Sequence, residues 1–216
     1  MSTAIIGAGH IGETVAHHLV AGGERVVLAA SEPPETLAER LGDLASAATV
    51  GDALSAADVV VFAVWFDVEK SLIDQNRAAL AEKIVVDPSN PVAVNDKGEF
   101  SRTLPDGVSA GSVIAALVPE TAHFVKAFGT VSAPSLAEGA HRKPKRAVLF
   151  YATDDAKAQA AIEPLISAAG FDPVKAGGVD AAIRIEMFGD LHDYGGLHGR
   201  LVNRDEARGL VAPSPA

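Results

Sequence analysis

The stretch Thr3-Ala4-Ile5-Ile6-Gly7-Ala8-Gly9-His10-Ile11-Gly12 decides the fold of this chain. Its first four residues have the character of a short strand, and apolar residues then recur at helical spacing from position 11 to position 21. The glycines between them follow the pattern G-x-G-x-x-G, which is a weak signal alone but a specific one where it joins a strand to a helix. Gly7 would make the tight turn, Gly9 would let the backbone approach a pyrophosphate, and Gly12 would let helix and strand pack closely. The sequence therefore predicts a site for a pyridine dinucleotide, NAD(H) or NADP(H), built by Gly7, Ala8, Gly9, His10, Ile11 and Gly12.

Strand-like and helix-like segments alternate along the rest of the chain. Residues 59–64 (VVVFAV) are apolar at every position, as in strands that are buried on both faces of a parallel sheet. The alternation predicts an α/β fold with a doubly wound, mostly parallel Rossmann sheet. Further strands are expected at residues 25–30, 48–50, 84–87, 123–128, 147–152 and 172–175, and helices at 33–44, 68–80, 112–117, 154–169 and 180–187.

Three parts of the chain are expected to differ in character. Residues 1–130 would form the NAD(P)-binding Rossmann domain, and residues 131–203 a smaller C-terminal α/β extension packed on it. Residues 91–111 are rich in Pro, Gly, Asn and Asp and predict a long loop, at a place where such folds bind substrate. Residues 204–216 lose periodicity and end in Pro-Ser-Pro-Ala, which predicts a flexible tail.

Composition narrows the class of protein. The 216 residues are 48% hydrophobic but contain no uninterrupted apolar run of the ~20 residues that a membrane span requires. There is no cysteine, which excludes disulfides and thiolate zinc sites. The formal net charge of −10 disfavours nucleic acid, and the one basic cluster, at residues 141–146, is interpreted as a solvated loop. We expect a cytoplasmic protein, without signal peptide, that binds neither nucleic acid nor membrane and forms a homodimer.

The end of the second predicted strand bears on the choice of dinucleotide. A carboxylate at Glu32 would accept hydrogen bonds from the adenosine ribose and would repel a 2′-phosphate, which favours NAD. Against this, Ser31 could donate to a phosphate. Arg40 is expected to lie a helical turn too far away to reach it. Both dinucleotides therefore stay open at this point.

Several further motifs carry a family resemblance. In order along the chain they are Leu28-Ala29-Ala30-Ser31, Ala63-Val64-Trp65-Phe66, Asp87-Pro88-Ser89-Asn90-Pro91 and Val125-Lys126-Ala127-Phe128-Gly129-Thr130. Together with the glycine pattern they resemble the NADP oxidoreductases dependent on the deazaflavin coenzyme F-420, to which the reductase domains of the STEAP metalloreductases are related. The resemblance covers about residues 1–187. It implies hydride transfer between a nicotinamide and a second ring or small carbonyl acceptor.

The resemblance also implies roles for individual residues. Ala63, Val64 and Asn90 would flank the nicotinamide ribose, although Asn90 could instead cap a turn. Trp65, Phe66 and Phe128 would wall the nicotinamide cleft, with packing in the core as the alternative. No catalytic residue is assigned, since hydride transfer between stacked rings needs orientation more than an acid or a base.

Three positions depart from the family pattern. Glu32 stands where arginine is usual, Gly129 stands where asparagine is usual, and Trp65-Phe66 replaces a Pro-Trp pair. Two other hypotheses therefore stay open: an NAD(P)H reductase that uses no deazaflavin, and a non-catalytic module that senses the dinucleotide. His192 and His198 lie among carboxylates and could line a substrate pocket, but Gly195-Gly196 would leave them poorly held as metal ligands, so no metal is predicted.

Overall fold

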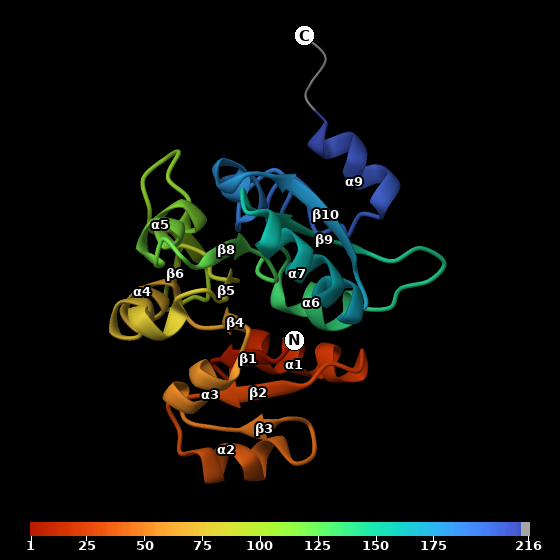
Figure 1. Ribbon diagram of the computed structural model, residues 1–216. Coiled ribbons are helices and arrows are strands. Elements are labelled where there is room, and N and C mark those ends of the chain that lie inside the picture. The colour runs from red at the N-terminus through yellow and green to blue at the C-terminus, as the bar shows by residue number, and fades with distance from the viewer. Residues whose placement is uncertain (213–216) are drawn as a thin grey trace.

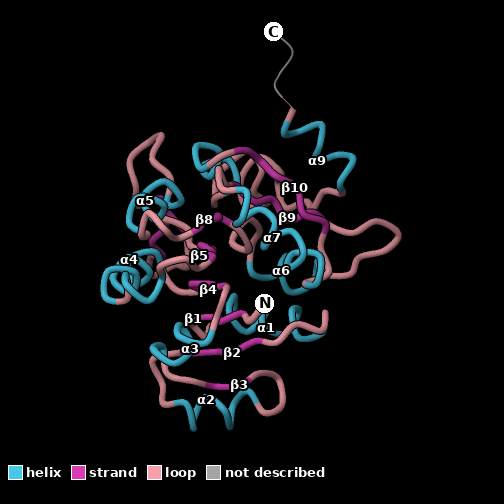
Figure 2. Tube along the Cα trace, in the orientation of Figure 1, coloured by secondary structure: helices cyan, strands magenta, loops and turns pink. Residues whose placement is uncertain are grey.

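The computed structural model describes residues 1–212 and has one eight-stranded sheet flanked by helices (Figures 1 and 2). The strands are β1 (Thr3–Ile6), β2 (Val26–Ala29), β3 (Ser46–Ala47), β4 (Val59–Phe62), β5 (Ile84–Asp87), β6 (Val92–Val94), β7 (Phe100–Arg102), β8 (His123–Lys126), β9 (Val148–Ala152) and β10 (Asp172–Gly177). The α-helices are α1 (His10–Ala21), α2 (Pro34–Leu41), α3 (Val50–Ala56), α4 (Phe66–Gln75), α5 (Ala110–Leu117), α6 (Ala133–Gly139), α7 (Ala156–Ala168), α8 (Ala182–Ile185) and α9 (Arg204–Val211). Short 3₁₀ turns are η1 (Arg77–Leu80) and η2 (Val179–Ala181). Of the helices in residues 1–212, none has the length and apolar character that a bilayer crossing needs.

The strand order confirms the doubly wound α/β class. The sheet runs β10-β9-β8-β5-β4-β1-β2-β3, and the pairs from β3 to β8 are all parallel. Strand β9 pairs with β8 in the antiparallel sense, and β10 pairs with β9 in parallel. From β1 the chain first builds outward through β2 and β3, and then returns to β4 on the other side of β1. The carboxyl ends of β1 and β4 thus form the switch point at which such sheets bind ligands.

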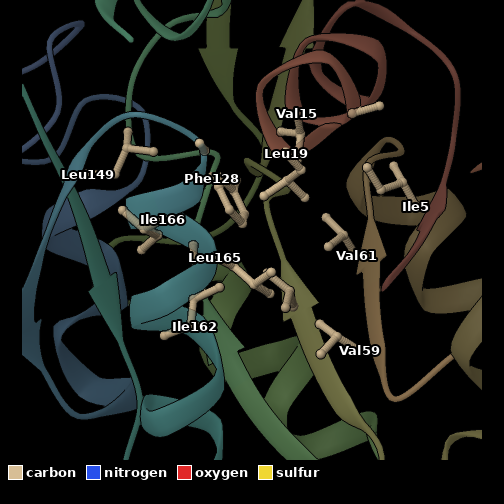
Figure 3. Close-up of a cluster of buried hydrophobic side chains, with 14 of the residues drawn as sticks. Ile5, Val15, Leu19, Val59, Val61, Phe128, Leu149, Ile162, Leu165 and Ile166 are labelled. Atoms are coloured by element: carbon tan, nitrogen blue, oxygen red, sulfur yellow. The ribbon is translucent and has the colours of Figure 1, made fainter. Parts of the chain in front are cut away.

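Both faces of the sheet are covered, which explains the unbroken apolar strands. Ile5 and Val61 face the layer of α1, α6 and α7, where they join Leu19 and Leu165 in one buried cluster (Figure 3). The alternate residues of the same strands, such as Phe62, face α3, α4 and α5. A strand between two helical layers has no solvent face, so every position in it can be apolar.

The predicted strand at residues 48–50 is wrong. Strand β3 lies at Ser46–Ala47, and Thr49 instead begins a helix that the sequence analysis missed. The Thr49 hydroxyl accepts a hydrogen bond from the Asp52 amide, at 3.1 Å. This N-cap satisfies a free N–H of α3, and so the local capping outweighs the β-propensity of Thr49 and Val50.

Three other predicted boundaries also differ from the structure. The segment predicted as a loop at residues 91–111 contains the β6–β7 hairpin. Helix α5 begins at Ala110, two residues before the predicted start, because the Ser109 hydroxyl caps it by accepting from the Ser112 amide. Strand β8 ends at Lys126, because Phe128 has a φ of +65° that no strand can continue.

The C-terminal part of the chain extends the same sheet through β9 and β10. The segment predicted as a tail forms helix α9 from Arg204. Asn203 and Glu206 form a capping box at its start, and Ala207 is buried against β9, β10 and neighbouring residues. Reciprocal capping and one buried face stabilise a helix that apolar periodicity alone did not reveal. Residues 213–216 of the predicted tail lie outside the described residues.

Candidate cofactor and substrate site

The three glycines of the glycine loop differ in how closely the rest of the protein packs against them. A Cβ atom at Gly7 would overlap the carbonyl of Ala63, and one at Gly12 would overlap the carbonyl of Gly7, so the packing of the protein itself requires both glycines. Gly7 also has a φ of +107°, which side chains other than hydrogen rarely tolerate. At Gly9, by contrast, no protein atom lies within 4 Å of where a Cβ would be. Open space beside the backbone at Gly9 is what the approach of a pyrophosphate needs.

The start of helix α1 suits an anion. No side chain caps the Gly9 end of the helix within residues 1–212, so its first N–H groups are free to bind a ligand. His10 is exposed at the first helical position, whereas Ile11 packs partly against the core and Ala8 lies beside it. The residues present therefore fit a dinucleotide pyrophosphate.

The adenosine end of the site holds an arginine that the sequence analysis placed too far away. The Arg40 guanidinium pairs with Glu32, and also with Glu13 in the first turn of α1. The same guanidinium lies 3.5 Å from the carbonyl oxygen of Ala8. Helix α2 turns back over the end of β2, which brings Arg40 to the glycine loop; Ser31 is exposed beside it.

The end of β4 lies directly against the glycine loop. The atoms nearest to a Cβ added at Gly7 belong to Ala63 and Val64. The predicted position of these two residues beside the nicotinamide ribose stays a prediction. Trp65 follows with 61% of its surface exposed, while Phe66 is buried in the core. Of the two aromatic residues, only Trp65 is available to cover a ligand.

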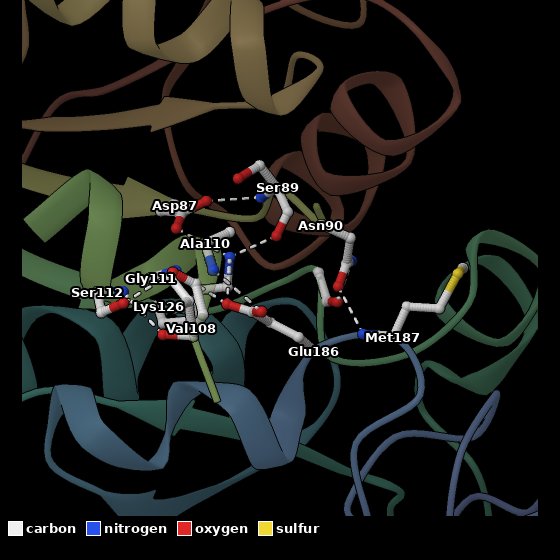
Figure 4. A network of polar contacts seen from close by, with 12 residues as sticks. Asp87, Ser89, Asn90, Val108, Ala110, Gly111, Ser112, Lys126, Glu186 and Met187 are labelled. Atoms are coloured by element: carbon white, nitrogen blue, oxygen red, sulfur yellow. Dashed lines mark hydrogen bonds and ion pairs between the residues drawn. The ribbon is translucent and has the colours of Figure 1, made fainter. Parts of the chain in front are cut away.

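Asn90 at the end of β5 acts as a bridge between distant segments (Figure 4). Its side-chain amide donates to the carbonyl of Gly129, at 2.9 Å, and its oxygen accepts from the amide of Met187, at 2.6 Å. Both polar atoms are thus engaged by backbone groups. Asn90 holds the Gly129 and Met187 segments together, and the predicted direct contact with a ribose stays a prediction.

Phe128 and Gly129 differ from what the resemblance implied. Phe128 is fully buried and packs with Val15 and Leu19, so its side chain belongs to the core and does not wall a cleft (Figure 3). A side chain at Gly129 would overlap the carbonyl of Pro88. The backbone approaches so closely there that the asparagine usual in the family has no room.

Comparison with known proteins identifies the family. Residues 2–91 match the family described as NADP oxidoreductase, coenzyme F420-dependent. A hypothetical protein from Sinorhizobium meliloti is 31% identical, with a TM-score of 0.80 over 95% of this chain and 96% of that one. The chain belongs to the F420-dependent NADP oxidoreductase family.

One further solved structure carries a name from the same family, and a more distant one shares the fold. A proposed F420-dependent NADP-reductase from Arthrobacter sp. FB24 is 25% identical, with a TM-score of 0.72 over 84% of this chain and 87% of that one. A 3-hydroxyisobutyrate dehydrogenase from Mycobacterium tuberculosis, 18% identical, shares the fold with a TM-score of 0.58 over 84% of this chain and 56% of its own. A search of curated protein sequences found no match. The protein is an NAD(P)-dependent oxidoreductase.

A buried charge network lies beneath the site of this oxidoreductase (Figure 4). Lys126 pairs with Asp87, at 2.8 Å, and with Glu186, at 3.6 Å, and all three side chains are fully buried. Glu186 also accepts from the amides of Ala110 and Gly111 at the start of α5. Burial by itself lowers the pKa of Lys126, but the carboxylates of Asp87 and Glu186 raise it by more than burial lowers it. The net pKa therefore lies above the ordinary value, and the ammonium is retained. The network joins the ends of β5 and β8 to the segment that carries Met187.

A fourth ionisable residue completes this network. Glu69 on α4 is fully buried, and neither carboxyl oxygen has a hydrogen-bond partner within residues 1–212. Burial, and secondly the charge of Asp87, raise the pKa of Glu69 well above its ordinary value. With Glu69 protonated, the two cations Lys126 and Arg102 balance Asp87 and Glu186; Arg102 lies 3.9 Å from Glu186.

The C-terminal histidines do not meet in the structure. His192 is buried, and its Nδ1 lies 2.9 Å from the Tyr194 amide, whereas His198 is exposed. Asp193 accepts from both the amide and the hydroxyl of Ser132. Burial raises the pKa of Asp193, but hydrogen bonds from His192 and Ser132 together lower it below the ordinary range. Within residues 1–212 no three His, Cys, Asp or Glu residues gather as a metal site would require.

The roles of Arg40, Lys126 and Glu69 were not predicted from the sequence. One signal was present: Asp87 and Lys126 both end apolar strands at the same sheet edge, where buried charges need partners. Glu69 and Arg40 gave no comparable signal, because each lies on a helix of mixed composition.

Proposed function

We propose that this oxidoreductase transfers a hydride between the nicotinamide of NAD(P)(H) and a second flat ring, with a deazaflavin of the coenzyme F420 type as the first acceptor to test. The observation that carries the proposal is the glycine loop, where Gly9 alone faces open space at the switch point of the sheet. Membership in the family supplies the reaction class. When bound, the nicotinamide supplies the hydride, and one proton from water completes reduction of the acceptor.

The chain's own residues would orient the two rings and exclude water. Gly7, Gly9 and the free N–H groups of α1 would hold the pyrophosphate. Ala63 and Val64 would then lie beside the middle of the dinucleotide, and the exposed Trp65 would cover the nicotinamide. Asn90 would hold Gly129 and Met187 in place as the opposite wall. Such positioning is the main contribution a protein makes to hydride transfer.

A reductase that uses no deazaflavin is the second candidate, and two observations favour it. Members of the family usually have an asparagine where this chain has Gly129, so the amide that the resemblance implies is missing here. The acidic tail of a deazaflavin would need positive charge nearby, and the basic stretch at residues 141–146 is held at the other end of α1 from the glycine loop. The His141 amide donates to the carbonyl of Gly170, two residues after Ala168, whose carbonyl lies against Gly22. Gly22 ends α1, and the 12 residues of α1 separate it from Gly9 by roughly 18 Å.

The test is a spectroscopic assay with purified protein. NADH and NADPH are each mixed with coenzyme F420, and the loss of nicotinamide and deazaflavin absorbance is followed. Loss of equal molar amounts of reduced nicotinamide and oxidised deazaflavin, calculated from the two absorbances, is the expected result. Oxidation of the nicotinamide by flavins, quinones or small carbonyl compounds, without any deazaflavin turnover, would favour the second candidate. No oxidation with any acceptor would contradict both and favour a sensing role. Cytoplasmic location and a homodimer are further proposals, the latter checked by light scattering.

A further inference from the structure

We propose that the ion-pair cluster of Arg40, Glu13 and Glu32 makes this protein select NAD(H) over NADP(H), in contrast to the cofactor in the family's description. The inference rests on the proposed function, because it names the dinucleotide that the same site takes. In this proposal Arg40 is a positioning residue: it holds the Glu32 carboxylate, which recognises the adenosine ribose.

Three elements converge at the cluster. Glu32 follows the end of β2, Glu13 lies in the first turn of α1, and Arg40 lies in the last turn of α2. One guanidinium nitrogen contacts Glu13, and another contacts Glu32 and lies 3.5 Å from the carbonyl of Ala8. The cluster therefore adjoins the glycine loop at the position where the adenosine ribose of a bound dinucleotide lies.

The side chains are accessible to a ligand without being loose. Exposed fractions are 41% for Arg40, 28% for Glu32 and 34% for Glu13. A guanidinium is planar and rigid, so pairing at two of its nitrogens restricts the side chain more than a single contact would. Arg40 thus holds the Glu32 carboxylate at the end of β2, where it can accept hydrogen bonds from the two ribose hydroxyls.

The net negative charge of the cluster disfavours binding of the 2′-phosphate of NADP(H). Two carboxylates and one guanidinium carry a net charge of −1, and a 2′-phosphate would add about two further negative charges at neutral pH. Arg40 could bind that phosphate only by leaving both carboxylates, which would then face the phosphate unpaired. The ribose hydroxyls of NAD(H) carry no charge, and they suit a carboxylate acceptor. Ser31 can donate to either group and does not discriminate.

Calorimetric binding, which needs no turnover, tests the proposal. NAD⁺ and NADP⁺ are titrated into the full-length protein and three variants, each checked for folding by circular dichroism. We expect the natural protein to bind NAD⁺ at least ~10-fold more tightly. Glu32→Arg should reverse the preference. Arg40→Met should weaken NAD⁺ binding several-fold, because the Glu32 carboxylate is no longer held in place. The control, Glu39→Gln on the same helix, removes one exposed negative charge outside the cluster and should leave the ratio unchanged.

Three results would overturn the proposal. They are equal affinities, a natural preference for NADP⁺, and an unchanged NAD⁺ affinity in Arg40→Met, which would leave Arg40 without a positioning role. Binding of neither dinucleotide would overturn this proposal and the proposed function together. A clear NAD⁺ preference without hydride transfer to any acceptor would contradict the proposed function alone.

Discussion

Gly9 lies beside open space, which the proposed function assigns to the pyrophosphate of the dinucleotide. A Cβ atom added at this position would have no protein atom within 4 Å apart from its chain neighbours, and the backbone φ of −89° is open to any residue. We therefore expect Gly9→Val to fold with unchanged thermal stability. The same side chain would occupy the space of the pyrophosphate and weaken dinucleotide binding at least ~10-fold, or about 1.4 kcal/mol, measured by calorimetry.

Gly12→Val is the matched control, because its side chain would overlap the carbonyl of Gly7 inside the protein. This variant should lower the midpoint of thermal unfolding, whereas Gly9→Val should not. Unchanged dinucleotide affinity in folded Gly9→Val would place the cofactor site elsewhere.

At the scale of elements, Asn90 connects β5 with the loop after β8 and the segment after α8. Asn90→Ala removes the hydrogen bonds to Gly129 and Met187 and leaves both partly buried backbone groups without this partner. We expect a loss of roughly 1–3 kcal/mol in the free energy of unfolding. The Met187 amide should also exchange its hydrogen faster, which hydrogen-exchange mass spectrometry can follow over this segment.

Asn76→Ala provides the comparison, since it removes a hydrogen bond to Leu72 at the far end of α4. It should leave exchange around Met187 unaltered. Equal exchange in Asn90→Ala and the natural protein would show that the C-terminal segment is held by other contacts.

At the scale of the whole molecule, the buried network makes stability depend on pH through Glu69. The pKa of Glu69 is raised above its ordinary value, so the folded state binds a proton that the unfolded state releases. The stabilisation is complete below the ordinary pKa and is lost as pH rises through the raised one. Glu69→Gln keeps the uncharged form at every pH. Its free energy of unfolding, relative to the natural protein, should therefore rise by up to about 1.4 kcal/mol per pH unit as the pH increases above the ordinary glutamate pKa.

Urea unfolding at several pH values measures this difference, with Asp74→Asn on the exposed face of the same helix as the control. The control should change stability little, and without the same trend. Parallel pH profiles for Glu69→Gln and the natural protein would mean that Glu69 is ionised in the folded state.

Features with a local cause could be predicted. The strand–glycine loop–helix unit follows from residues that are adjacent in sequence, and the strands β1, β5 and β9 lie within one residue of the expected ranges. The predicted secondary structure was wrong where a capping side chain starts a helix that the apolar pattern does not indicate. Thr49 caps α3 in this way, and Asn203 caps α9. Caps depend on one hydrogen bond, and apolar periodicity does not report it.

The sequence by itself determined the Rossmann class, the position of the glycine loop and the family, because backbone conformation and strand periodicity depend on neighbouring residues. Only the tertiary structure decided that Arg40 reaches Glu32 and Glu13, that Asn90 holds Met187, and that Phe128 lies in the core. Asn90 and Met187 are 97 residues apart in sequence. The order of strands in the sheet and the path of the helices over it bring such residues together, and no local pattern records that order.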